Sequence, residues 1–156
     1  MDKRARLLIV DDDPMILESL ISILEAEDYE TRAARTGQEA LKELKRSFFN
    51  AVLVDMKLPD MTGLELLARV RDTTPRIRKL ILTGYPDVPS TVETVNKKAD
   101  AYLIKPFDPY NLIRLIEKNL EEQKEELRLT HEKVLDYVKV RLRQIDEDTN
   151  IVHQEA

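Results

Sequence analysis

The order of its apolar segments constrains this chain more than any other feature of the sequence. Short, unbroken apolar runs alternate with segments in which apolar residues recur at every third or fourth position, through about the first 120 residues. An unbroken run predicts a strand buried on both faces, and the longer recurrence predicts an amphipathic helix. The predicted strands cover residues 7–10, 29–34, 51–54, 80–82 and 101–104, and the predicted helices begin near residues 14, 36, 64, 89 and 108.

Strands that alternate with helices form parallel sheets with helices on both faces. Five strands favour the flavodoxin-like strand order 2-1-3-4-5 over the six-stranded order of dinucleotide-binding domains. The turn after the first strand, Asp11-Asp12-Asp13-Pro14, has no glycine, which argues against a Rossmann nucleotide site or a P-loop. The sequence therefore predicts an α/β fold with a five-stranded parallel sheet in the order 2-1-3-4-5 and an extended C-terminal helix.

Three of the predicted helices carry start signals in the sequence. Asp13 and Asp108 each precede a proline, and an aspartate N-cap followed by proline is a favoured helix start. Thr36 is followed three residues later by Glu39, which is the spacing of a capping box. We therefore expect Asp13 to cap the first helix.

Composition excludes some kinds of site and argues against others. The chain has no cysteine, which excludes disulfides, thiolate catalysis and cysteine-ligated zinc, and its two histidines lie late in the sequence. The net charge of -5 argues against non-specific nucleic-acid binding, which requires a basic face. No apolar stretch approaches the ~20 residues that span a bilayer, and no signal peptide is visible. We therefore expect a cytoplasmic protein that binds neither nucleic acid nor membrane directly.

Polar residues follow four of the predicted strands at the point where each strand ends. Asp11 and Asp12 follow the first strand, and Asp55 follows the third. Thr83 and Lys105 follow the fourth and fifth. Ligands of open α/β sheets bind at the carboxyl ends of strands where the strand order reverses, which here is between the first and third strands. We therefore expect these five side chains to lie together.

This set of side chains suits phosphoryl transfer. Three close carboxylates ionise together only where a cation compensates them, and hard oxygen ligands of this kind suit Mg²⁺. Asp55 is the candidate nucleophile, Lys105 would neutralise phosphoryl oxygens, and Thr83 would donate a hydrogen bond to one of them. Taken singly, the aspartates could be helix caps and the other residues ordinary turn residues. Their coincidence at one predicted edge favours a common site.

Four segments, LLIVDDDP, AVLVDMKLPDMTGLELL, KLILTGYPD and ADAYLIKPFD, resemble the receiver domain of two-component response regulators in their order and spacing. The likeness covers roughly residues 6–120. It implies that Asp11, Asp12 and Asp55 hold the metal, that Asp55 is the phosphoacceptor, and that the backbone carbonyl of Lys57 completes the metal shell. Asp13 has no catalytic place in this pattern.

The resemblance also implies a switch mechanism. Thr83 would be the switch hydroxyl, Lys105 the lysine that pairs with the phosphate, and Tyr102 the switch aromatic, although a plain half-buried strand aromatic is the alternative for Tyr102. The bond before Pro106 would be cis. The usual glycine before the last strand is missing, and residues 97–100 read Lys-Lys-Ala-Asp instead.

The implied function is a signalling switch that accepts a phosphoryl group from a sensor histidine kinase in a Mg²⁺-dependent reaction. Slow self-hydrolysis would reset it, so it is not a conventional turnover enzyme. One alternative is a receiver-like interaction module that works without phosphorylation, against which the intact acids count. Another is a metal-dependent phosphatase, but such enzymes usually carry a second aspartate two residues beyond the nucleophile, where this chain has Lys57.

The sequence continues as a helix beyond the expected end of a receiver. No glycine or proline follows Pro109, and apolar residues recur mostly at every third or fourth position from Ile113 to Ile145. Gln123 and either Thr130 or His131 interrupt the series. We expect an imperfect coiled-coil seam and a parallel homodimer through residues 113–145, with a solvated, unpartnered helix as the alternative.

The expected organisation has three parts. Residues 1–120 form the receiver, residues 121–147 a helical coiled-coil extension or linker, and residues 148–156 a disordered tail. The extension resembles the linkers that join receivers to output domains, including those of AAA+ transcription activators. Control of an output domain or a partner protein is therefore implied.

Overall fold

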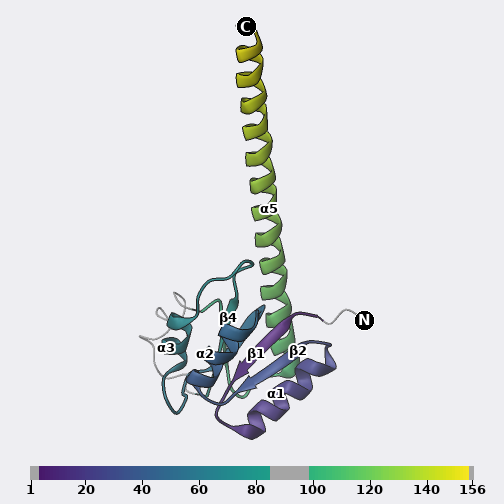
Figure 1. The fold of residues 1–156 in the computed structure, drawn as a ribbon. Coiled ribbons are helices and arrows are strands. Elements are labelled where there is room, and N and C mark those ends of the chain that lie inside the picture. The colour runs from purple at the N-terminus through teal and green to yellow at the C-terminus, as the bar shows by residue number, and fades with distance from the viewer. Residues whose placement is uncertain (1–3, 85–98, 155–156) are drawn as a thin grey trace. The chain divides into compact units, whose positions relative to one another are not determined.

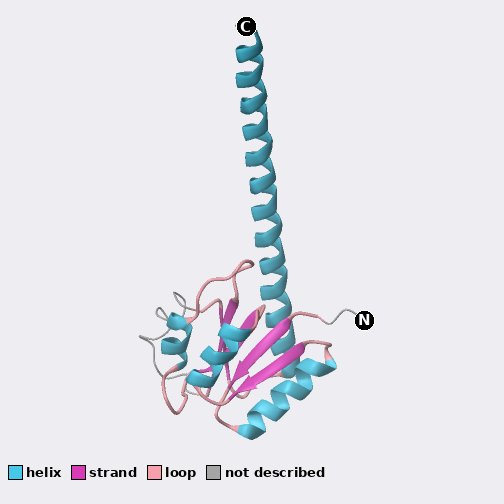
Figure 2. Ribbon diagram, in the orientation of Figure 1, coloured by secondary structure: helices cyan, strands magenta, loops and turns pink. Residues whose placement is uncertain are grey.

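The computed structural model describes residues 4–84 and 99–154, so the predicted helix over residues 89–98 lies outside the described residues. Five strands form one sheet in the order β2-β1-β3-β4-β5, and every neighbouring pair is parallel (Figures 1 and 2). The predicted fold class and strand order are confirmed. The strands are β1 Arg6–Val10, β2 Glu30–Ala34, β3 Ala51–Asp55, β4 Arg78–Thr83 and β5 Ala101–Ile104.

The described helices are α1 Pro14–Ala26, α2 Gly37–Arg46, α3 Gly63–Arg69 and α5 Pro109–Gln154. Asp13 caps α1 as predicted, because its side chain accepts a hydrogen bond from the Met15 N–H at 2.9 Å. At α2 the predicted capping box is half formed. Thr36 accepts from the Glu39 N–H, but the Glu39 carboxylate accepts from the Arg35 N–H instead of from the N-cap. A complete box caps α3, between Thr62 and Glu65.

Each face of the sheet carries its own apolar core, and Figure 1 shows the sheet between α1 on one side and α2 and α3 on the other. Apolar residues alternate in direction along each strand, so neighbours such as Leu7 and Leu8 serve opposite faces. Side chains of α1 and the first turns of α5 fill one core, and α2 and α3 fill the other. Burial on both faces explains the unbroken apolar strands.

The chain divides into two compact units, Met1–Gln123 and Lys124–Ala156. Three residues of α5, Leu112, Ile116 and Leu120, are buried in the core of the first unit. Ile116 and Leu120 are therefore unavailable to a partner chain, although the sequence places them in the dimer seam. The helix also continues through Gln154, past the start of the tail expected at residue 148. Within the described residues, no helix is long and apolar enough to cross a bilayer.

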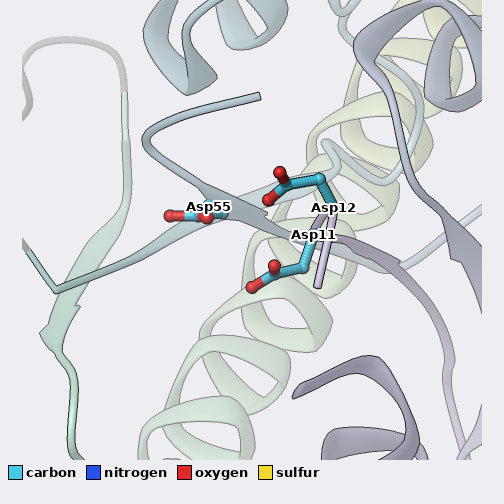
Figure 3. Close-up of side chains that lie close together, drawn as sticks. All are labelled: Asp11, Asp12 and Asp55. Carbon is cyan, nitrogen blue, oxygen red and sulfur yellow. The ribbon is translucent and has the colours of Figure 1, made fainter. Parts of the chain in front are cut away.

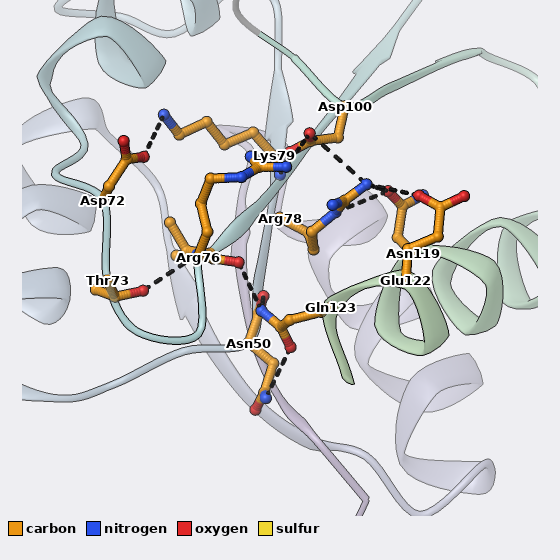
Figure 4. Close-up of polar contacts among 11 residues, drawn as sticks. Asn50, Asp72, Thr73, Arg76, Arg78, Lys79, Asp100, Asn119, Glu122 and Gln123 are labelled. Carbon is orange, nitrogen blue, oxygen red and sulfur yellow. Dashed lines mark hydrogen bonds and ion pairs between the residues drawn. The ribbon is translucent and has the colours of Figure 1, made fainter. Parts of the chain in front are cut away.

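Gln123 is buried at the last turn of the first unit, with 2% of its surface exposed. Its Nε2 donates to the backbone carbonyls of Asn50 and Arg76, each at 2.8 Å, and its Oε1 accepts from the Asn50 amide at 3.1 Å (Figure 4). The sequence suggests that Gln123 merely interrupts an apolar series. The structure gives it a different role, because it fastens α5 to the segments that precede β3 and β4.

A second group of polar contacts lies beside Gln123 in Figure 4. The buried guanidinium of Arg78 donates to Asn119 Oδ1 from Nε and Nη2, at 3.2 and 3.0 Å, and to Glu122 at 2.8 Å. Asp100 accepts two hydrogen bonds from Arg76, at 2.8 and 3.1 Å, and one from the Lys79 N–H at 2.8 Å. These bonds join β4, the start of β5 and α5 at the amino-terminal edge of the sheet.

The Asp100 contacts predict a specific dependence of stability on pH. Burial by itself raises the pKa of Asp100, but the Arg76 hydrogen bonds, the Lys79 N–H and the positive charge of Arg78 outweigh it, so the pKa lies below its usual value. A lowered carboxyl pKa stabilises the fold above the unfolded pKa of about 3.9, and this stabilisation is lost as the pH falls through the folded value. We expect Asp100→Asn to lower the free energy of unfolding by about 2 kcal/mol at neutral pH. Urea unfolding of both proteins should show this difference shrinking toward about pH 3, and a constant difference would contradict the assignment.

Candidate functional site

Three carboxylates meet at the carboxyl-terminal edge of the sheet, where β1 and β3 lie side by side (Figure 3). One oxygen from each of Asp11, Asp12 and Asp55 lies within 4.8 Å of the others. Asp11 is buried with 2% of its surface exposed, Asp55 is half-buried and Asp12 is exposed. The sequence prediction that these three residues come together is therefore confirmed.

Local hydrogen bonds hold the first turn in place. The Asp11 N–H donates to the Ala34 carbonyl at 3.1 Å, which extends the β1–β2 pairing by one residue. The Asp11 carboxylate accepts from the Asp13 N–H at 2.9 Å, and Asp13 in turn caps α1. Asp11 and Asp12 therefore belong to the site, whereas Asp13 caps the helix α1.

Lys105 reaches the same cluster from the end of β5. Its Nζ lies 2.6 Å from Oδ2 of Asp11 and 3.8 Å from Oδ2 of Asp55. Its backbone N–H donates to the Thr83 carbonyl at 2.7 Å, which fixes the segment beside the end of β4. The Lys105–Pro106 peptide bond is cis, as expected. The Lys105 ammonium group thus lies close to two of the three carboxylates, those of Asp11 and Asp55.

The surroundings of Asp55 disfavour its ionised form. Burial raises the pKa of this carboxyl most strongly, and the neighbouring charges of Asp11 and Asp12 raise it further. The positive charge of Lys105 and a hydrogen bond from the Lys57 N–H lower it, but the net result is a pKa above the ordinary value. A second cation beside the carboxylates would offset this cost.

The donor set fits Mg²⁺. Octahedral coordination at about 2.0–2.1 Å places neighbouring ligand atoms about 3 Å apart and opposite ones about 4 Å apart. Carboxylate oxygens that lie within 4.8 Å of one another are already close to such separations. The ligand atoms are all hard oxygens, and no histidine or cysteine belongs to the cluster.

The other predicted site residues lie on β4, on β5 and in the loop after β3, and their roles stay predictions. Thr83, the last residue of β4, is fully buried, and Tyr102 is half-buried against the core beneath α2 and α3. Ile81 pairs with Tyr102 and Thr83 pairs with Ile104, so Thr83 and Tyr102 belong to the same face of the sheet. Lys57 forms an isolated bridge with Thr62. The metal-binding role of its carbonyl stays a prediction.

Two residues that shape the site escape sequence reasoning. A Cβ at Gly63 would lie 2.5 Å from the Asp55 carbonyl oxygen, so only glycine lets α3 begin this close to β3. The Asp60 carboxylate accepts from the N–H groups of Gly37 and Gln38 at 2.9 and 3.0 Å, which ties the loop after β3 to the start of α2. The Gly37 N–H bond contributes most to holding the pKa of Asp60 below its usual value. Both contacts join distant segments and leave no local signal.

The chain matches the response regulator receiver domain family over residues 7–117. It belongs to that family. The cluster of Asp11, Asp12 and Asp55 is the acidic triad typical of a receiver's Mg²⁺ site. The likeness explains why four strand ends carry complementary chemistry.

The receiver is similar to parts of larger regulators. It is 33% identical over 120 residues to the transcriptional regulatory protein GlrR of Escherichia coli, covering 77% of this chain and 27% of GlrR. It is 35% identical over 114 residues to the transcriptional regulatory protein ZraR of the same species, covering 73% of this chain and 26% of ZraR. The match thus spans about a quarter of the length of these relatives.

Solved receiver structures align with nearly their whole length. A CheY-like receiver from Methanospirillum hungatei is 44% identical with a TM-score of 0.73, covering 78% of this chain and 98% of that one. The response regulator TrrA of Thermotoga maritima, solved in complex with Mg²⁺ and a beryllium fluoride, is 32% identical with a TM-score of 0.67. That alignment covers 74% of this chain and 99% of TrrA.

Proposed function

We propose that this receiver is a phosphorylation-activated signalling switch whose Asp55 accepts a phosphoryl group from a sensor histidine kinase. The observation that carries the proposal is the joint placement of three carboxylates and the Lys105 ammonium at one edge of the sheet. Membership of the receiver family supports the kinase as the donor.

The residues have separate tasks in the transfer. A carboxylate oxygen of Asp55 attacks the phosphorus of phosphohistidine in line, so that an O–P bond forms while the P–N bond breaks and the imidazole leaves. Lys105 is placed to exchange its contact with Asp11 for one with the added phosphoryl oxygens, because its Nζ already lies between Asp11 and Asp55. Asp11, Asp12, Asp55 and the Lys57 carbonyl would hold Mg²⁺, which when bound supplies positive charge beside the phosphoryl group.

The response to phosphorylation would pass through Thr83 and Tyr102. The buried Thr83 hydroxyl would move toward a phosphoryl oxygen, and Tyr102, on the same face of the sheet, would turn into the space released. The surface carried by β4, β5 and α5 would then shift between two populated states without a change of fold.

The C-terminal helix would carry the output. Residues 124–151 of α5 expose nine large apolar side chains, an arrangement that favours a homodimer. The seam would lie beyond Gln123, because Ile116 and Leu120 are buried in the receiver. GlrR and ZraR are named as transcriptional regulators. By analogy, the dimer would control an output domain or partner, including one in transcription.

Acetyl phosphate tests the proposal without a kinase. Mass spectrometry should show the addition of one phosphoryl group in the presence of Mg²⁺ and its absence in EDTA. Asp12→Ala should lose most labelling because it removes a metal ligand. The matched control, Asp13→Ala, should label normally and lose only about 1 kcal/mol of stability, because it removes a helix cap. Absence of labelling in the wild-type protein would favour the interaction module that works without phosphorylation.

A further inference from the structure

The second unit of the chain carries an ordered apolar series on α5. Leu135, Val138, Leu142 and Ile145 follow one another at steps of three, four and three residues, with 58, 44, 56 and 47% of their surfaces exposed. Alternating steps of three and four place these side chains on one stripe of the helix, with Leu135 and Leu142 at heptad position a and Val138 and Ile145 at position d.

We propose that residues 134–149 of α5 pair in parallel and in register with the same residues of a second copy of this chain, and that Arg141 and Asp146 determine this orientation. The inference rests on the homodimer proposed above. It adds the register and the residue pair that selects the parallel orientation.

Charge complementarity favours the parallel arrangement. In the heptad that begins at Leu135, Arg141 occupies position g and Asp146 occupies position e of the following heptad. In a parallel pair, each g residue faces the partner residue five positions further along the chain. Arg141 therefore faces the partner's Asp146, and the two-fold symmetry repeats this pairing of opposite charges on the other side of the seam.

The antiparallel arrangement with the same apolar overlap brings like charges together. Pairing Leu135 with the partner's Ile145 centres the overlap on residue 140. Lys139 then faces the partner's Lys139, and Arg141 faces the partner's Arg141, because e meets e and g meets g in antiparallel pairs. Glu132 would face the partner's Asp146. The same apolar stripe is thus compatible with two orientations, and the flanking charges disfavour one of them.

The residues on either side of the apolar stripe limit its length and the number of helices that can associate through it. Leucine at heptad position a with β-branched residues at position d favours more than two helices in an uninterrupted seam. Here the preceding a position holds Arg128, which is paired within its own helix with Glu125 at 2.6 Å and with Glu132, and the following a position holds Thr149. A charged side chain at position a can reach water in a two-helix coiled coil, but it would be enclosed in a bundle of four helices. Two helices are therefore favoured.

Exchange of charges in the 156-residue chain tests the residue pair. Arg141→Glu and Asp146→Arg should each weaken self-association roughly tenfold at low salt, because each replaces two attractive contacts by repulsive ones. The double variant, and an equal mixture of the two single variants, should recover association to within about threefold of wild type. Arg143→Glu, which makes the same change of charge at position b, away from the seam, is the control and should associate like wild type. Sedimentation equilibrium, before and after treatment with acetyl phosphate, measures these constants.

Cross-linking tests the orientation, since the chain has no cysteine of its own. Ile145→Cys should form disulfide-linked dimers on mild oxidation, because d residues meet their own counterparts in a parallel pair. A mixture of Leu135→Cys and Ile145→Cys chains should give little mixed cross-link. Abundant mixed cross-link, or association unaffected by the charge exchanges, would overturn this inference while leaving the homodimer intact. A monomer under all conditions would overturn both, and acetyl phosphate labelling would still report on the phosphorylation switch.

Discussion

Asp55→Asn is expected to abolish labelling by acetyl phosphate. The amide nitrogen and oxygen of asparagine are poor nucleophiles and carry no negative charge. The variant therefore lacks both the attacking oxygen and one of the carboxylate ligands of the metal. The Asp11, Asp12 and Lys105 side chains would stay in place, because they are positioned by β1, the start of α1 and the end of β5. The loss should therefore be complete and not a partial change in rate.

The same variant should remain folded. Burial and neighbouring acids raise the pKa of the Asp55 carboxyl, so the ionised group reduces stability above that pKa and its replacement by a neutral amide removes the cost. Without Mg²⁺, thermal unfolding of Asp55→Asn should occur at or above the wild-type temperature. The control is Asp13→Asn, which makes the same change two residues from Asp11, keeps a good helix cap and should label fully. Labelling of Asp55→Asn at the wild-type level would refute Asp55 as the phosphoacceptor.

Gln123→Leu is expected to cause a large loss of stability for an isosteric change, lowering the free energy of unfolding by about 3 kcal/mol. Leucine fills a similar volume but leaves the carbonyls of Asn50 and Arg76 without the Gln123 donor, and the Asn50 amide without its acceptor. Buried polar groups that lose their partners account for large effects of this kind.

Urea unfolding monitored by circular dichroism measures the difference. Gln144→Leu is the matched control, because Gln144 is an exposed residue of the same helix whose contact is a 3.4 Å bond with Arg141. Its effect should stay within about 0.5 kcal/mol. Equal losses in both variants would contradict the assignment of the cost to the buried hydrogen bonds, because leucine and glutamine have similar helix propensities.

The positions of the site residues could be predicted because strand order and strand ends are both visible in the sequence. The apolar runs end at Asp11, Asp55 and Thr83, and a parallel sheet brings such ends to one edge. For each segment, the pattern of its apolar residues and the identity of its last residue are enough to predict the position of the site. The same reasoning gave Asp13 its role as a helix cap, which is a local interaction.

Sequence reasoning failed where the partner of a residue lies far along the chain. An apolar period cannot distinguish a core within the chain from a seam between chains. The period therefore places Ile116 and Leu120 in the dimer seam, although they are buried in the receiver. Gln123 has polar partners more than 45 residues away, and a glutamine in an apolar series gives no sign of them. Gly63 is required because the Asp55 backbone lies close by, which no local pattern reports.

Charged groups are paired differently at the two edges of the sheet. At the amino-terminal edge, Arg78, Asp100 and Gln123 have partners within the fold. At the carboxyl-terminal edge three acids lie together, and the Lys105 ammonium pairs with two of them. Strands of five residues separate these edges by about 16 Å, beyond the range at which substitutions usually influence one another. The fold can therefore retain an unfavourable acidic cluster, since its stability is secured elsewhere. Substitutions that change the acidic site and substitutions that alter thermal tolerance are open to independent change, in evolution and in engineering alike.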